Sequence, residues 1–192
     1  MGTSNAATFN SDSEVVILGW DPADTHSNNF WTELASTSWT SGSSIDTGTF
    51  TAKKYLWIQI SLTTTNANFN QLFFNNDTQT NYSLRYSTNG GADGTDVNVP
   101  YGWYTALDDG GSSVHRSVFS NIFMINTSSK EKLGISHSAW VNGTQTGAGY
   151  APNRVESVGK WTNTSSQITS VRVSNVVGNN YNGGQIKVWG SD

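Results

Sequence analysis

The chain contains no cysteine among its 192 residues, which excludes disulfide bonds and thiolate metal sites. Charged residues are scarce, at 12% against about 25% in ordinary globular proteins. Lysine and arginine are missing from the whole segment before Lys53. Because nucleic-acid binding needs a basic patch or arm, this segment and a net charge of −4 argue against a nucleic-acid partner.

Long apolar runs are also absent. No stretch approaches the ~20 residues that a transmembrane helix needs, so we expect no membrane insertion. The first residues lack the basic segment and long apolar run of a signal peptide. We therefore expect synthesis in the cytoplasm of the producing cell.

Aromatic residues, in contrast, are plentiful: eight Trp, seven Tyr and eight Phe argue for a folded core rather than disorder. The length fits a single domain with or without an arm. Residues 1–29 are polar except for Val15–Leu18, which predicts an arm packed on the body or on a neighbour, or a first edge strand. Residues 30–192 are predicted to form a single β-sandwich domain.

The apolar residues in this second region recur with a period of two. Leu56, Ile58, Ile60 and Leu62 alternate with more polar positions, which predicts a strand with one buried face. The segment 118–125 is apolar on both faces and is predicted to be a central strand. No segment shows a helical period with caps. Eight to ten short strands and polar turns favour an antiparallel jelly-roll β-sandwich, with an immunoglobulin-like sandwich as the alternative.

Several motifs carry a family resemblance. They are the strand 54–60 (KYLWIQI), the Asn-rich segment 74–82, the Lys130-Glu-Lys132 strand, the block 159–166 (GKWTNTSS) and the Gly-x-x-Ile-x-x-Trp-Gly pattern at 183–190. In these motifs the chain resembles small structural proteins of tailed, especially aquatic, bacteriophages. The resemblance covers roughly residues 50–192 and leaves the first thirty unmatched.

The resemblance implies a jelly-roll protein on the virion surface, of the tail-fibre-like or capsid-decoration type, without catalytic residues. By analogy with such proteins, a homotrimer that contacts other virion proteins of the capsid or tail is expected. The leading hypothesis is therefore a non-enzymatic capsid-decoration (cement) protein. The alternatives are a tail-fibre or receptor-binding protein that binds host glycan, and a free-standing carbohydrate-binding module.

Catalytic groupings are weak in the sequence. A glycosidase needs two positioned carboxylates, and the candidates on strands are Glu33, Glu131 and Glu156. Glu131 lies between Lys130 and Lys132, which indicates a solvated pairing, and Glu156 lies near Arg154. Three histidines among many hydroxyl groups, with no Gly-x-Ser-x-Gly elbow, do not indicate a nucleophilic triad. No catalytic residue is predicted.

Two loops offer oxygen ligands that Ca²⁺ could use: Asp93 with Asp96, and Asp108 with Asp109. No EF-hand spacing is present, and aspartate is common in turns, so no cofactor is predicted beyond this weak Ca²⁺ candidate.

Two aromatic clusters fall in or beside predicted loops. Trp103 and Tyr104 form one, and Trp140 and Tyr150 form the other. Exposed aromatic faces stack on sugars, so these four residues are the candidate glycan contacts. A loop aromatic can equally cover the hydrophobic core.

Overall fold

The computed structural model describes residues 30–64, 70–106, 116–141, 147–175 and 178–192. Within these ranges it contains twelve strands and no helix, which confirms the predicted all-β class. The described residues therefore include no helix that is long and apolar enough to cross a membrane. The strands are β1 (Thr32–Trp39), β2 (Ser44–Asp46), β3 (Tyr55–Thr64), β4 (Asn70–Phe74), β5 (Tyr82–Thr88), β6 (Gly94–Val99), β7 (Tyr104–Ala106), β8 (Arg116–Ile125), β9 (Lys132–Trp140), β10 (Asn153–Trp161), β11 (Val171–Asn175) and β12 (Tyr181–Ser191).

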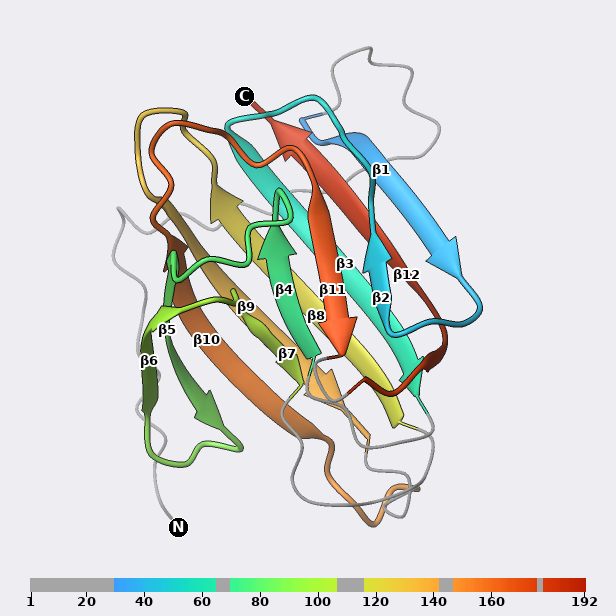
Figure 1. Ribbon diagram of the computed structural model, residues 1–192. Coiled ribbons are helices and arrows are strands. Elements are labelled where there is room, and N and C mark those ends of the chain that lie inside the picture. The colour runs from blue at the N-terminus through green and yellow to red at the C-terminus, as the bar shows by residue number, and fades with distance from the viewer. Residues whose placement is uncertain (1–29, 65–69, 107–115, 142–146, 176–177) are drawn as a thin grey trace, which may run out of the picture.

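The strands form two antiparallel sheets that pack face to face as a β-sandwich (Figure 1). The larger sheet has the order β1-β12-β3-β8-β9-β10-β5-β6, and the smaller sheet has the order β2-β11-β4-β7. The chain passes repeatedly from one sheet to the other. Two hairpins, β5–β6 and β9–β10, both add to the larger sheet beyond β8 and make it twice as wide as the smaller one.

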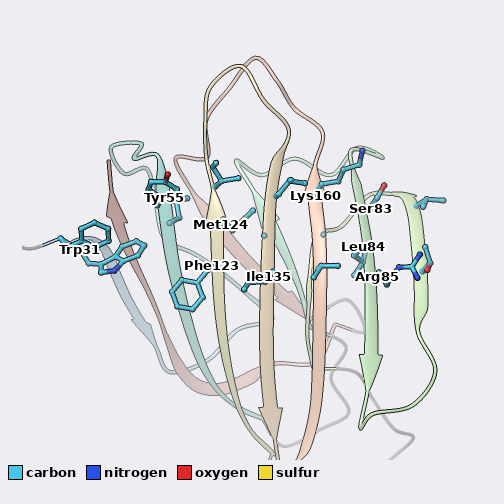
Figure 2. A pocket seen from close by; sticks show the side chains of 18 residues that line it. Trp31, Tyr55, Ser83, Leu84, Arg85, Phe123, Met124, Ile135 and Lys160 are labelled. Carbon is cyan, nitrogen blue, oxygen red and sulfur yellow. The ribbon is translucent and has the colours of Figure 1, made fainter. Parts of the chain in front are cut away.

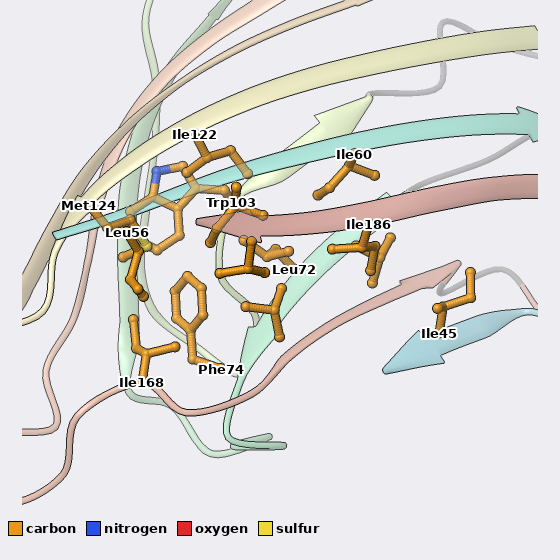
Figure 3. Packing of buried hydrophobic residues seen from close by; sticks show 14 of the residues in the cluster. Ile45, Leu56, Ile60, Leu72, Phe74, Trp103, Ile122, Met124, Ile168 and Ile186 are labelled. Carbon is orange, nitrogen blue, oxygen red and sulfur yellow. The ribbon is translucent and has the colours of Figure 1, made fainter. Parts of the chain in front are cut away.

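The core lies between the two sheets and is lined by the alternate residues that the sequence predicts (Figure 3). In β3 the side chains of Leu56, Ile58, Ile60 and Leu62 are almost completely buried. In β11 and β12 the valines and isoleucine alternate in the same way with half-buried residues. These strands follow the period of two because every second side chain of a strand points to the same face.

Strand β8 is central, as its two-sided apolar pattern predicts. It stands fourth in the larger sheet, between β3 and β9. Val118, Ile122 and Met124 point into the core, whereas Phe119 and Phe123 are exposed on the outer face.

In strands β9 and β10 several small polar residues face the core and several large apolar residues face outward. Ser136 and Ser157 face the interior and are hydrogen-bonded to each other at 2.6 Å. Leu133, Ile135 and Val158 point outward, and each exposes half or more of its surface. The larger sheet therefore presents apolar side chains on both of its faces in this region.

Candidate functional site

The outer face of the larger sheet carries a continuous apolar row. Strand register places five residues directly opposite one another across five neighbouring strands: Trp189, Trp57, Phe123, Ile135 and Val158. The row ends at Glu33 on the β1 side and at Arg85 on the β5 side. Monomeric soluble proteins seldom leave such a contiguous apolar surface exposed, so this row is the strongest candidate for a binding surface.

Aromatic rings fill the β12–β3–β8 part of the row. The centroid of Trp57 lies 4.8 Å from that of Trp189 and 5.7 Å from that of Phe123, with which it stacks at 13°. Trp31, just before β1, meets Trp57 edge to face at 6.0 Å. The rings thus stand beside one another and use their faces in mutual packing.

An open hollow of about 940 Å³ lies over this face (Figure 2). Its floor comes from β3, β8, β9, β10, β5 and β6, and Phe30 and Trp31 form its rim on the β1 side. Most of the lining is aliphatic or aromatic; Arg85 and Lys160 are its charged side chains. The hollow therefore combines a broad apolar floor with two cations near its β5–β6 side.

A polar row runs directly beside the apolar row. The register places these residues opposite one another in neighbouring strands: Lys187, Gln59, Asn121, His137, Glu156 and Ser87. The two rows are linked by the indole Nε1 of Trp57, which donates to Asn121 Oδ1 at 2.5 Å. The outer face therefore carries an apolar row and a polar row side by side, with the exposed Phe119 beyond the polar row.

Each of the three carboxylates considered for catalysis lies in its own ion pair, and Glu131 lies just before β9 rather than on a strand. Glu33 lies 3.6 Å from Lys187. Glu156 lies 3.2 Å from Arg154, the partner that their proximity in the sequence suggests. Glu131 pairs with Lys160 at 2.9 Å rather than with its sequence neighbours. These three acids do not share one cleft with a reacting position between them.

The solvated pairing expected for Lys132 is wrong. Its side chain is fully buried, and Nζ donates to the carbonyl oxygens of Lys130 at 2.9 Å and Asn163 at 2.6 Å. The ammonium also lies 5.7 Å from the centroid of the Trp161 ring. Desolvation by burial lowers the pKa of Lys132. Lys132 therefore ties the start of the β10–β11 connection, at Asn163, to the turn before β9, at Lys130.

Three of the four predicted glycan contacts are buried, which corrects the expectation for them. Trp103 and Tyr104 expose 1% and 3% of their surface, and Trp140 exposes 2%. Trp103 packs against Phe74, with ring centroids 5.4 Å apart, and it covers the glycines of β9 and β10. A sugar in solvent cannot reach these rings. Tyr150 alone is exposed, in the turn at 147–150 before β10.

The Ca²⁺ candidates are not brought together in the described part of the chain. Asp96 accepts a hydrogen bond from the Tyr104 hydroxyl at 2.6 Å, and Asp93 pairs with Arg85 at 3.6 Å. Asp108 and Asp109 lie outside the described residues. Among the residues that the structure describes, no group of three His, Asp or Glu side chains could hold a metal ion.

Sequence reasoning missed the main feature of this surface. The apolar pattern of β8 indicated two apolar faces, but Leu133, Ile135 and Val158 were not recognised as a continuation of the outer one. A usable signal was present, because these residues alternate with serines and glycines, which are small enough to leave space on the inner face for a large side chain from elsewhere in the core. In such strands the larger apolar residues can face outward.

Comparison of the chain with protein-family models, curated proteins and solved structures finds no match.

Proposed function

We propose that the protein is a non-enzymatic structural subunit of a tailed-phage particle, a jelly roll displayed on the virion surface as capsid decoration. The observation that carries this proposal is the order of the strands. When the hairpins β5–β6 and β9–β10 are set aside, the order β1-β12-β3-β8 faces the order β2-β11-β4-β7. The remaining chain crosses to the other sheet at every step except from β4 to β7, which are neighbours in the smaller sheet, and its first and last strands pair, as in a jelly roll.

The outer face of the larger sheet supports a role in protein contact. Its apolar row is broad and aliphatic at the β9–β10 side, which suits burial under an apolar polypeptide segment. The three acids considered for catalysis each form an ion pair with a neighbouring cation. An assembly subunit, arranged as a homotrimer like other phage jelly rolls, accounts for these features better than an enzyme does.

Labelling of intact particles tests this proposal. Antibodies raised against the purified chain would be applied to phage particles from the producing culture and located by electron microscopy. Regular labelling of the head is the expected result. Labelling confined to the tail would support the fibre alternative, and particles without label would contradict a virion protein.

A receptor-binding function through glycan is the second candidate. Trp31, Trp57 and Trp189 lie on the outer face beside Gln59 and Asn121, which offer hydrogen bonds to hydroxyl groups. The mutual stacking of the rings weighs against it, because a sugar needs a free aromatic face. A glycan array probed with the purified chain decides between capsid decoration and receptor binding. Specific binding that a Trp57→Ala variant loses would favour the receptor-binding function.

A further inference from the structure

The hollow on the larger sheet needs an occupant, and we propose that it is the N-terminal segment of the same chain, with Val15–Leu18 lying on the apolar floor. The inference is independent of where on a particle the protein is displayed. It rests on where the described chain begins, on the reach of the preceding residues, and on the match in apolarity.

The described chain enters β1 from the rim of the hollow. Phe30 and Trp31 line the hollow themselves, and they pack edge to face at 5.6 Å. Trp31 in turn contacts Trp57 on β3. The residues immediately before β1 are therefore already part of this surface, and the segment that precedes them is tethered there.

The tether is long enough to place Val15–Leu18 anywhere on the floor. The hollow extends from β3 to β6, which is five inter-strand steps or about 24 Å at ~4.8 Å each. Residues 19–29 connect the apolar run to Phe30, and when extended they span up to ~36 Å. A tether of this length raises the local concentration of the run to the millimolar range, which favours the chain's own segment over that of a second molecule.

The chemistry of the segment matches the hollow. Val15–Leu18 is its longest apolar run, and four large aliphatic residues in water gain from burial on an apolar floor. The segment also holds four acids, Asp12, Glu14, Asp21 and Asp24, and neither lysine nor arginine. The two charged residues that line the hollow, Arg85 and Lys160, are basic, but each already pairs with an acid, Asp93 and Glu131 respectively, so the match rests on apolarity rather than on charge.

Cross-linking tests the placement, and the absence of cysteine gives a clean background. In the full chain, Ser13→Cys would be combined with Ser83→Cys, which lines the hollow, and treated with a short bismaleimide. A matched control would combine Ser13→Cys with Ser44→Cys, an exposed position on the smaller sheet. Denaturing gels and thiol titration would separate links within a chain from links between chains.

The proposal predicts rapid linkage within the chain for the first pair, and at least tenfold slower linkage for the control pair. A product of double mass would show that copies exchange segments, and would overturn placement within the chain. Equal rates for the two pairs would overturn any preference for the hollow.

A second experiment does not depend on the placement of a single pair of engineered cysteines. Substitution of serine for all four residues of Val15–Leu18 in the full chain should abolish the preferential cross-link. It should also raise the fluorescence of 1-anilinonaphthalene-8-sulfonate, a dye that binds exposed apolar surface, by severalfold. Unchanged dye fluorescence, with the far-ultraviolet circular dichroism of the parent retained, would contradict the proposal.

Discussion

The indole of Trp103 lies directly over Gly159, where a Cβ atom would stand 3.0 Å from the Trp103 Cε2 atom. Gly159 is paired with Gly134 across β10 and β9, and a Cβ there would come within 3.1 Å of the same indole. The glycine pair thus leaves the space in which one of the three buried tryptophans of the core lies. This contact explains why Trp103 is a core residue and not a surface one.

Replacing Gly159 by alanine should destabilise the fold. The added methyl group would press on the indole and on the Ser83 carbonyl oxygen, 3.1 Å away, which is backbone and cannot move freely. Overpacking of this kind costs about 1–3 kcal/mol of the free energy of unfolding. Urea denaturation followed by tryptophan fluorescence measures it. Gly149→Ala is the control, since a Cβ there meets nothing within 4 Å, and equal stability of both variants would refute the packing argument.

Asn126 should be a strong determinant of stability. Its buried amide accepts from the Ile168 N–H at 2.7 Å and donates to the carbonyls of Lys53 at 3.0 Å and Ile168 at 3.1 Å. Asn126→Leu would leave these backbone groups buried without partners, at a cost of about 1–3 kcal/mol for each. Thermal denaturation should show a large drop for this variant. Ser129→Ala, an exposed position in the adjoining turn, should change little.

The hydrogen bonds of Asp77 lead us to expect that the folded protein loses stability in acid. Burial is the largest single influence on its pKa and raises it, but hydrogen bonds from Trp161, Asn81 and Gln79 together lower it below the ordinary value of 3.8. With a lowered folded-state pKa, the stabilisation is complete above pH 3.8 and declines as the pH falls below that value. Asp77→Asn removes this dependence and costs about 1–3 kcal/mol at neutral pH.

Unfolding measured between pH 2 and pH 6 gives the comparison. The difference in unfolding free energy between the parent and Asp77→Asn should shrink as the pH falls below 3.8. A constant difference over the whole range would show that ionised Asp77 has no special role.

The burial of Tyr181 leads us to expect that the folded protein also loses stability in alkali. Burial raises its pKa above the ordinary value of 10.0, and its hydroxyl donates to Asn70 Oδ1 at 2.9 Å. With a raised folded-state pKa, stabilisation is complete below pH 10.0 and declines as the pH rises through and above it. Tyr181→Phe costs about 1 kcal/mol at neutral pH through the lost hydrogen bond.

Above pH 10.0 the difference in unfolding free energy between the parent and Tyr181→Phe should fall by up to about 1.4 kcal/mol per pH unit, so that it reaches zero and then changes sign. Chemical denaturation from pH 8 to pH 11.5 tests this. A gap that stays constant would mean that Tyr181 ionises as easily in the folded protein as in the unfolded one.

The sequence predicted the all-β class and the faces of several strands because those strands obey a simple period. Leu56 to Leu62 and the two-sided β8 are such cases, with large apolar residues on the buried face. Strands β9 and β10 could not be predicted in this way. Gly134 and Gly159 of these strands lie under Trp103, which leaves no room for a larger side chain at either position, and their neighbours Leu133, Ile135 and Val158 point outward.

The candidate site was predicted poorly for a related reason. Trp103 and Trp140 do lie in or beside loops, as the local polarity predicts, but long-range packing buries both. The apolar row depends on strand order, since Trp189, Trp57 and Ile135 are far apart in the chain and meet only in the assembled sheet. No local pattern contains that order.

The most direct test of the account is the solution mass of the purified chain, measured by light scattering with and without residues 1–29. An assembly subunit whose N-terminal segment lies on its own body should form a homotrimer in both cases. A monomer in both cases would contradict the assembly function and favour a free-standing binding module.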